Sequence, residues 1–139
     1  MKIYHFLTVI LLVFSFLTAC QGQPETSADV KPMLFTELYQ GDLSKVDKLT
    51  IRNGSTGELR TITDKAKIVQ WLQVMKDVRF VPDPNQEPRS GWRYWVSLYE
   101  GENKVFELFP NNVNGVYYLT DEKVMASMEE LFKTAKKEK

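Results

Sequence analysis

Hydrophobic and polar residues follow regular intervals through most of the chain beyond residue 31, and the interval changes from one segment to the next. Residues 48–52 alternate, with Leu49 and Ile51 on one side, and the turn at residues 53–57 leads into a second extended run over residues 58–62. A period of two is typical of a half-buried strand, and a short glycine-containing turn between two such runs is typical of a hairpin. The sequence therefore predicts a β-hairpin with one buried face.

Trp92–Glu100 is the most regular alternating segment. One set of its side chains is assigned to the core, namely Trp92, Tyr94, Val96 and Leu98. The opposite set consists of Arg93, Trp95, Ser97 and Tyr99. Turns at Gly101–Asn103 and Asn114–Gly115 connect this strand to extended runs over residues 105–109 and 116–119, which together predict an antiparallel meander. A further short strand is predicted over Val78–Val81.

Two segments repeat apolar residues at helical spacing. The first stripe is Ile68, Trp71, Leu72 and Met75, and the second is Val124, Met128, Leu131 and Ala135. Side chains at these intervals share one face of a helix, and a polar residue before the stripe caps its start. Thr63 or Asp64 is the expected cap of a helix over residues 64–76, and Thr120 that of a helix over residues 121–136. A short helix is also expected between Pro32 and Gly41.

These elements predict an α+β domain over residues 32–139. We expect an antiparallel sheet of about five to six strands, with the two main helices packed on one face and the short N-terminal helix capping one end of the core. The segment 82–91 interrupts the pattern with three prolines and is expected to be a long loop. Asp83, Asn85 and Glu87 alternate in it like the start of a calcium loop, but Pro88 stands where an EF-hand needs glycine.

The first residues have a different pattern. Lys2 precedes an apolar run over residues 3–17, and Ala19-Cys20 follows it. This layout is typical of a secretory signal, and a helix of that length would span about 22 Å, less than the bilayer hydrocarbon of about 30 Å. We therefore expect a signal peptide over residues 1–19 rather than a permanent membrane-spanning helix.

Leu17-Thr18-Ala19-Cys20 resembles a bacterial lipobox. The resemblance implies that Cys20 becomes the first residue of the mature chain and receives an S-diacylglyceryl group and an N-acyl group. Residues 20–31 would then be a flexible tether from a lipid anchor, with the domain on the extracytoplasmic face of the cell membrane. The alternative is a secreted protein cut near Ala19 with an unmodified thiol at Cys20.

Composition narrows the chemistry of the domain. The chain has 18 Lys and Arg and 18 Asp and Glu, so its formal net charge is zero. It therefore lacks the excess of positive charge that would favour nucleic-acid binding. His5 and Cys20 are its single histidine and single cysteine. The expected mature domain therefore contains no Ser-His or Cys-His pair, no typical zinc or haem ligand set and no disulfide. We expect it to use no cofactor or metal.

The order of these signals resembles that of small uncharacterised lipoproteins of Bacillus-type Gram-positive bacteria. The resemblance is carried by Gly41-Asp42-Leu43-Ser44-Lys45-Val46, Thr63-Asp64-Lys65, Gly91-Trp92-Arg93-Tyr94 and Asn114-Gly115-Val116-Tyr117-Tyr118. It implies an α+β fold and attachment to the outer face of the cytoplasmic membrane, and it assigns no catalytic residue.

Two functions fit the sequence. The first is a binding or interaction module of the cell envelope, with Arg93, Trp95 and Tyr99 as the candidate contact residues for a protein, peptide or glycan, because aromatic residues and arginine are enriched where surfaces bind. The second is a hydrolase with paired carboxylates, for which the candidates are Glu100, Glu102 and Glu107 around one predicted hairpin. Whether Trp95 is exposed or covered by the 82–91 loop is left open by the sequence.

Overall fold

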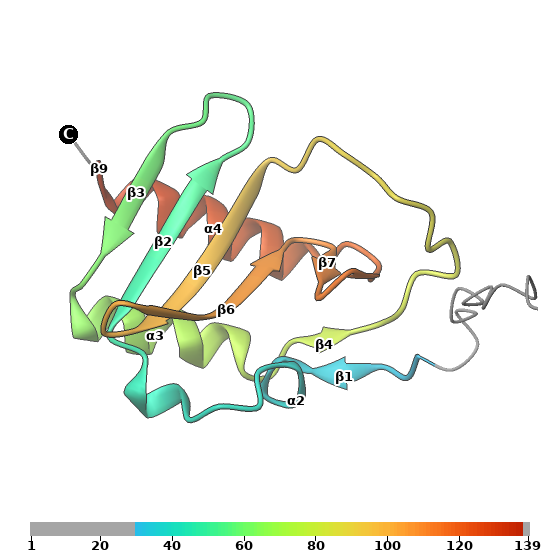
Figure 1. Cartoon of the computed structure of the whole chain (residues 1–139), viewed down its shortest axis with the longest axis horizontal. Helices are drawn as coiled ribbons and strands as arrows, with labels where there is room; N and C mark the ends of the chain where they lie inside the picture. The colour runs from blue at the N-terminus through green and yellow to red at the C-terminus, as the bar shows by residue number, and fades with distance from the viewer. Residues whose placement is uncertain (1–29, 138–139) are drawn as a thin grey trace, which may run out of the picture.

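The computed structural model describes residues 30–137, and the signal peptide, Cys20 and most of the tether lie outside this range. Figure 1 shows a sheet with helices behind it. The elements follow the chain in this order: β1 (Met33–Leu34), α2 (Phe35–Leu38), η3 (Leu43–Lys45), β2 (Lys48–Asn53), β3 (Leu59–Ile62), α3 (Lys65–Met75), β4 (Arg79–Phe80), β5 (Tyr94–Glu100), β6 (Asn103–Phe109), β7 (Asn112–Val113), β8 (Val116–Tyr117), α4 (Glu122–Thr134) and β9 (Lys136–Lys137). The predicted α+β class is confirmed.

The main sheet has the strand order β8-β7-β6-β5-β2-β3-β9, and every neighbouring pair is antiparallel. The predicted hairpin is β2 and β3, and the predicted meander is β5 to β8. The sheet has seven strands in the described part of the chain, against the expected five to six, because β9 adds an edge strand of two residues. Helices α3 and α4 cover one face of this sheet, as expected (Figure 1).

The core lies between that face and the two helices. In the three central strands, the register places Ile51 opposite Val96 and Val96 opposite Leu108, and all three side chains are fully buried. The helices supply the stripes that the sequence predicts: Ile68, Trp71, Leu72 and Met75 from α3, and Val124, Met128 and Leu131 from α4. A single contiguous cluster of apolar side chains therefore holds sheet and helices together.

Both main helices begin at an aspartate cap. Asp64 accepts hydrogen bonds from the backbone N–H groups of Ala66 and Lys67, which satisfies two donors that the first turn leaves free. In α4 the cap is Asp121, which accepts from Lys123 and Val124 in the same way. The expectation that Thr120 caps this helix is wrong, because the carboxylate one residue later reaches the free N–H groups instead.

Helix α4 also ends earlier than the sequence predicts. Its last residue is Thr134, and the backbone is extended at Ala135. Lys136 then pairs with Thr61 of β3. Ala135 and Lys136, which the prediction places in this helix, therefore lie beyond its end, and Lys136 belongs to an edge strand.

The N-terminal segment closes one end of the core. Strand β1 pairs with β4, so the predicted 78–81 strand belongs to a second, two-stranded sheet. Phe35, in the predicted short helix, is fully buried and packs edge-to-face on Trp71 at 6.2 Å and on Phe106 at 5.8 Å between ring centroids. Among the described residues, no helix is both long enough and apolar enough to cross a membrane.

Candidate partner-binding face

None of the described helices lies over the face of the sheet away from α3 and α4, which is turned to the viewer in Figure 1. We call it the open face. It consists of Lys48, Thr50 and Arg52 from β2, Trp95, Ser97 and Tyr99 from β5, and Glu107 and Phe109 from β6. The register places Lys48 opposite Tyr99, Thr50 opposite Ser97, and Arg52 opposite Trp95. Period-two alternation on three paired strands therefore collects these side chains on one surface.

Aromatic rings and cations are neighbours on the open face. The Lys48 ammonium lies 4.7 Å from the centre of the Tyr99 ring, and the Arg52 guanidinium lies 5.7 Å from that of Trp95. Trp95 is in turn 5.7 Å from Phe109, measured between ring centroids. Contacts of both kinds are attractive. They hold the rings in fixed positions while leaving Trp95 and Tyr99 partly exposed.

A polar group occupies the neighbouring part of the same face. Ser97 is 4% exposed, and its hydroxyl donates a hydrogen bond of 2.8 Å to Glu107 Oε2. The same oxygen accepts from Lys104 Nζ at 3.1 Å. The Ser97 hydroxyl therefore fixes the Glu107 carboxylate beside the aromatic rings.

The structure places two of the three candidate contact residues together. Trp95 and Tyr99 lie on the open face, but Arg93 does not, since its guanidinium is 3.9 Å from Glu129 of α4 and 5.4 Å from the Tyr94 ring. The prediction that Trp92 lies in the core is also wrong: its ring packs on that of Phe109, with 4.3 Å between ring centroids. Both errors have one cause, because regular strand geometry begins only at Tyr94 and the alternation cannot be extended backwards past it.

Sequence reasoning missed the cations that belong to this face. In the first hairpin, Lys48 and Arg52 alternate with Leu49 and Ile51 and so fall on its outer side, but nothing in the sequence connects them with Trp95 and Tyr99. The signal that would have found them is the strand pairing itself. If β2 is taken as the neighbour of β5, alternation on both strands places the basic residues of one opposite the aromatic residues of the other.

Each of the three glutamates that suggested a hydrolase contacts a different partner. Glu102 pairs with Lys48 at 3.1 Å, Glu107 pairs with Lys104, and Glu100 accepts a hydrogen bond of 3.0 Å from Tyr39. Burial, reinforced by this hydrogen bond, raises the pKa of Tyr39 to about 12. Each carboxylate therefore has its own partner, and the arrangement does not resemble two carboxylates facing each other across a cleft.

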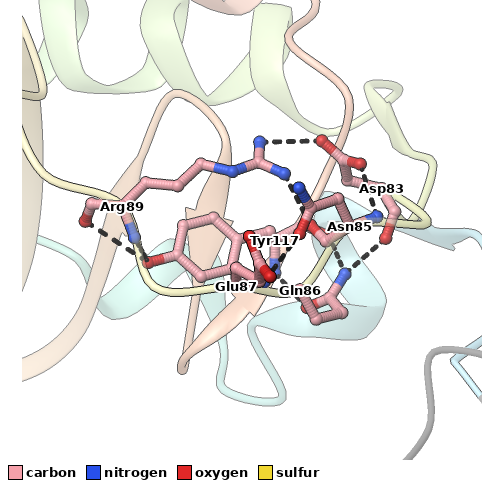
Figure 2. Close-up of polar contacts among 6 residues, drawn as sticks. All are labelled: Asp83, Asn85, Gln86, Glu87, Arg89 and Tyr117. Atoms are coloured by element: carbon pink, nitrogen blue, oxygen red, sulfur yellow. Dashed lines mark hydrogen bonds and ion pairs between the residues drawn. The ribbon is translucent and has the colours of Figure 1, made fainter.

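The 82–91 loop is held by its own polar contacts (Figure 2). Asp83 Oδ2 lies 2.8 Å from Arg89 Nη1, and Asp83 Oδ1 accepts from the Asn85 backbone N–H. The Arg89 guanidinium holds the pKa of Asp83 below its usual range, and the Asn85 contact acts in the same direction. Asp83 is thus engaged by an arginine, and no group of three or more metal-ligating side chains occurs in the part of the chain described.

The loop is also fixed to β8 rather than to Trp95. Gln86 accepts a hydrogen bond from the Tyr117 backbone N–H at 2.9 Å and donates one to the Tyr117 carbonyl at 2.9 Å. Arg89 lies over the Tyr117 ring, 5.1 Å from its centre (Figure 2). In Figure 1 the loop runs beside the sheet, so it leaves the open face uncovered.

Comparison with protein-family models, curated proteins and solved structures gives no match to this chain.

Proposed function

We propose that this chain is a lipid-anchored extracytoplasmic lipoprotein, and that its domain is a binding module of the cell envelope. The open face is its contact surface, and the partner is an envelope protein, peptide or glycan. The lipobox-like Leu17-Thr18-Ala19-Cys20 supports the anchor. A tether from Cys20 to Val30 reaches at most about 35 Å, which keeps the open face close to the membrane and to the inner layers of the envelope.

The observation that carries the proposal is the uncovered arrangement of Trp95, Tyr99 and Arg52 on adjacent strands. Tryptophan, tyrosine and arginine are the residues over-represented among binding hot spots. Here they are already held in position by strand pairing and by their mutual contacts. Few of these side chains therefore lose conformational freedom when a partner binds, which reduces the entropic cost of binding.

Binding is favoured over hydrolysis by the distribution of acidic side chains. A carboxylate hydrolase needs one acid and one base on opposite sides of the scissile bond. Glu100, Glu102 and Glu107 instead contact Tyr39, Lys48 and Lys104 respectively. Such contacts are more typical of carboxylates that stabilise the edge of a surface than of carboxylates that exchange protons with a substrate.

The proposal predicts that Trp95→Ala weakens retention of the purified domain on an envelope preparation, as measured by co-sedimentation with insoluble cell-wall glycan and by capture on detergent-solubilised membrane protein. Loss of a hot-spot tryptophan costs about 2 kcal/mol or more, or roughly thirtyfold in affinity. Stability should fall by only about 1 kcal/mol because Trp95 is partly exposed.

Phe132→Ala is the matched control. Phe132 is also a partly buried aromatic residue, but it packs on Tyr94 and under Arg60 on the helix side of the sheet. Retention by this variant should equal that of the wild type. If both variants lose retention equally, or if Trp95→Ala loses several kcal/mol of unfolding free energy, the open face is not the contact surface.

A further inference from the structure

The sequence contains two Asn-Gly pairs, Asn53-Gly54 and Asn114-Gly115, and both lie in turns between strands. Asparagine is a thermally labile residue, because the backbone nitrogen that follows it can attack its side-chain amide. A glycine in the following position leaves that nitrogen accessible, since glycine has no side chain to hinder the approach. The two pairs therefore have the same intrinsic chemistry, and a difference in their reactivity comes from the fold.

The fold restrains the Asn53-Gly54 pair. The Gly54 N–H donates a hydrogen bond of 2.8 Å to the Arg93 carbonyl, which holds the proton that this nitrogen must lose before it attacks. The Asn53 side chain is fixed too, because its Oδ1 accepts from the backbone N–H groups of Ser55 at 2.9 Å and Thr56 at 3.2 Å. Both reacting groups of this pair must therefore give up existing contacts before they react.

The Asn114-Gly115 pair is much less restrained. It is exposed at the turn between β7 and β8, and each of these strands has only two residues. The Gly115 N–H donates a longer hydrogen bond, of 3.3 Å, to Oδ1 of Asn112. The Asn114 side-chain amide makes no hydrogen bond with the rest of the described chain. Because an exposed turn between short strands opens locally at a low cost in free energy, this pair reaches a reactive geometry more often than the other.

We propose that Asn114 is a site of spontaneous deamidation and that the fold protects Asn53 from the same reaction. The Gly115 nitrogen gives its proton to water and bonds to Cγ of Asn114, while the Cγ–Nδ2 bond breaks and Nδ2 takes up a proton and leaves as ammonia. The product is a cyclic succinimide. Water then adds to one of its carbonyl carbons and breaks the bond from that carbon to nitrogen. Opening at Cγ gives aspartate and opening at the backbone carbon gives isoaspartate, so water is the one co-reactant.

The modification changes the surface around the turn. Asn114 lines a cavity of about 470 Å³ together with Tyr39, Glu100 and Phe106. Deamidation adds a negative charge to this wall, in which Glu100 is the one carboxylate among the described lining residues. Isoaspartate also carries the backbone through the former side chain, which lengthens the turn by one atom. Aged protein therefore differs from new protein in the charge near Glu100 and in the geometry of the β7–β8 hairpin.

Mass spectrometry of the full chain, purified in detergent and incubated at neutral and at mildly alkaline pH, tests the proposal. Peptides that contain each pair are quantified over time, and electron-transfer fragmentation distinguishes isoaspartate from aspartate. In the folded protein, position 114 should convert about tenfold faster than position 53 or more, because its reacting groups break fewer contacts. In urea the two positions should convert at similar rates. Position 114 should give both aspartate and isoaspartate, whereas direct hydrolysis of the side-chain amide gives aspartate alone.

Asn112→Ala tests the hydrogen bond to the Gly115 nitrogen. Removal of this acceptor should accelerate conversion at position 114 about threefold and leave position 53 unchanged, so position 53 is an internal control for unfolding. Asn111→Ala, which changes the neighbouring asparagine, is the matched control and should leave both rates as in the wild type. If Asn112→Ala unfolds the domain, conversion at position 53 accelerates as well, and the wild-type comparison decides.

Two results would overturn the proposal. They are conversion at position 114 that is no faster than at position 53 in the folded wild type, and formation of aspartate without isoaspartate. Neither result depends on Trp95 or on the anchor at Cys20, so failure here is distinguishable from failure of the proposed function.

Discussion

Replacing Leu72 by Asp is expected to unfold the domain. Leu72 is 6% exposed and lies on the face of α3 that packs against the sheet. The substitution removes a buried aliphatic side chain, which costs about 2 to 5 kcal/mol, and adds the cost of burying a carboxylate without a partner. Since a domain of this kind has about 5 to 15 kcal/mol of stability in total, the cooperative unfolding transition should be lost or displaced by tens of degrees. Circular dichroism during heating measures this.

Val69→Asp is the control on the same helix. Val69 is 48% exposed, so the change adds the same charge to the same helix but removes much less buried surface than Leu72→Asp does. Its melting temperature should stay within a few degrees of the wild type. A Leu72→Asp protein with the same melting temperature as the Val69→Asp control would contradict the packing of α3 on the sheet.

Replacing Cys20 by Ala is expected to release the protein from the membrane. Each methylene of an acyl chain contributes about 0.8 kcal/mol to membrane binding, so two or three chains hold the protein firmly and none leaves it unattached. Cells grown with a clickable fatty acid should label the wild type and not the variant. Fractionation should move the variant from the membrane to the soluble extracytoplasmic fraction.

Ser27→Ala, also within the tether, is the matched control and should be labelled and fractionated like the wild type. Equal labelling of the Cys20→Ala and wild-type proteins would exclude lipidation at this cysteine. Loss of labelling without release from the membrane would mean that some other part of the chain attaches it.

The elements and the core could be predicted from the sequence because each obeys a local rule. Alternation identifies β2 and the regular part of β5, and the i, i+3, i+4, i+7 stripe of Ile68 to Met75 identifies α3. Even the Asn114–Gly115 turn is as expected: both residues have positive φ, 52° and 85°, which this pair tolerates better than others. Such features depend on neighbours in the chain.

The composition of the open face depends on neighbours in space, and it was predicted only in part. Trp95 and Tyr99 follow from alternation alone, but Lys48 and Arg52 join them only through the pairing of β2 with β5. Arg93 was wrongly included because strand geometry stops at Tyr94, and a long side chain beyond that point turns to the nearest carboxylate, Glu129. Period-two reasoning is thus reliable inside a strand and fails at its end.

The structure also has an apolar groove between the outer sides of α3 and α4, which could not be predicted at all. Helical periodicity specifies which side chains face the sheet, but it does not specify how far apart two helices lie on it. Small residues such as Ala126 on the outer side leave the space open, while Lys67 and Thr134 meet only because α4 ends beside the first turn of α3. Such a junction is a property of the packed structure.

The most direct test of the open face as the contact surface is site-specific photocrosslinking in living cells. Benzoylphenylalanine is placed at Thr50, between Lys48 and Arg52 on the open face, and in a second protein at Gln73, which is exposed on α3. The adducts are detected as a shift in the mass of the tagged protein after illumination. The account predicts an adduct from position 50 that disappears when Trp95→Ala is added, and none of comparable yield from position 73. An adduct of equal yield from both positions, or one from position 50 that persists with Trp95→Ala, would contradict it.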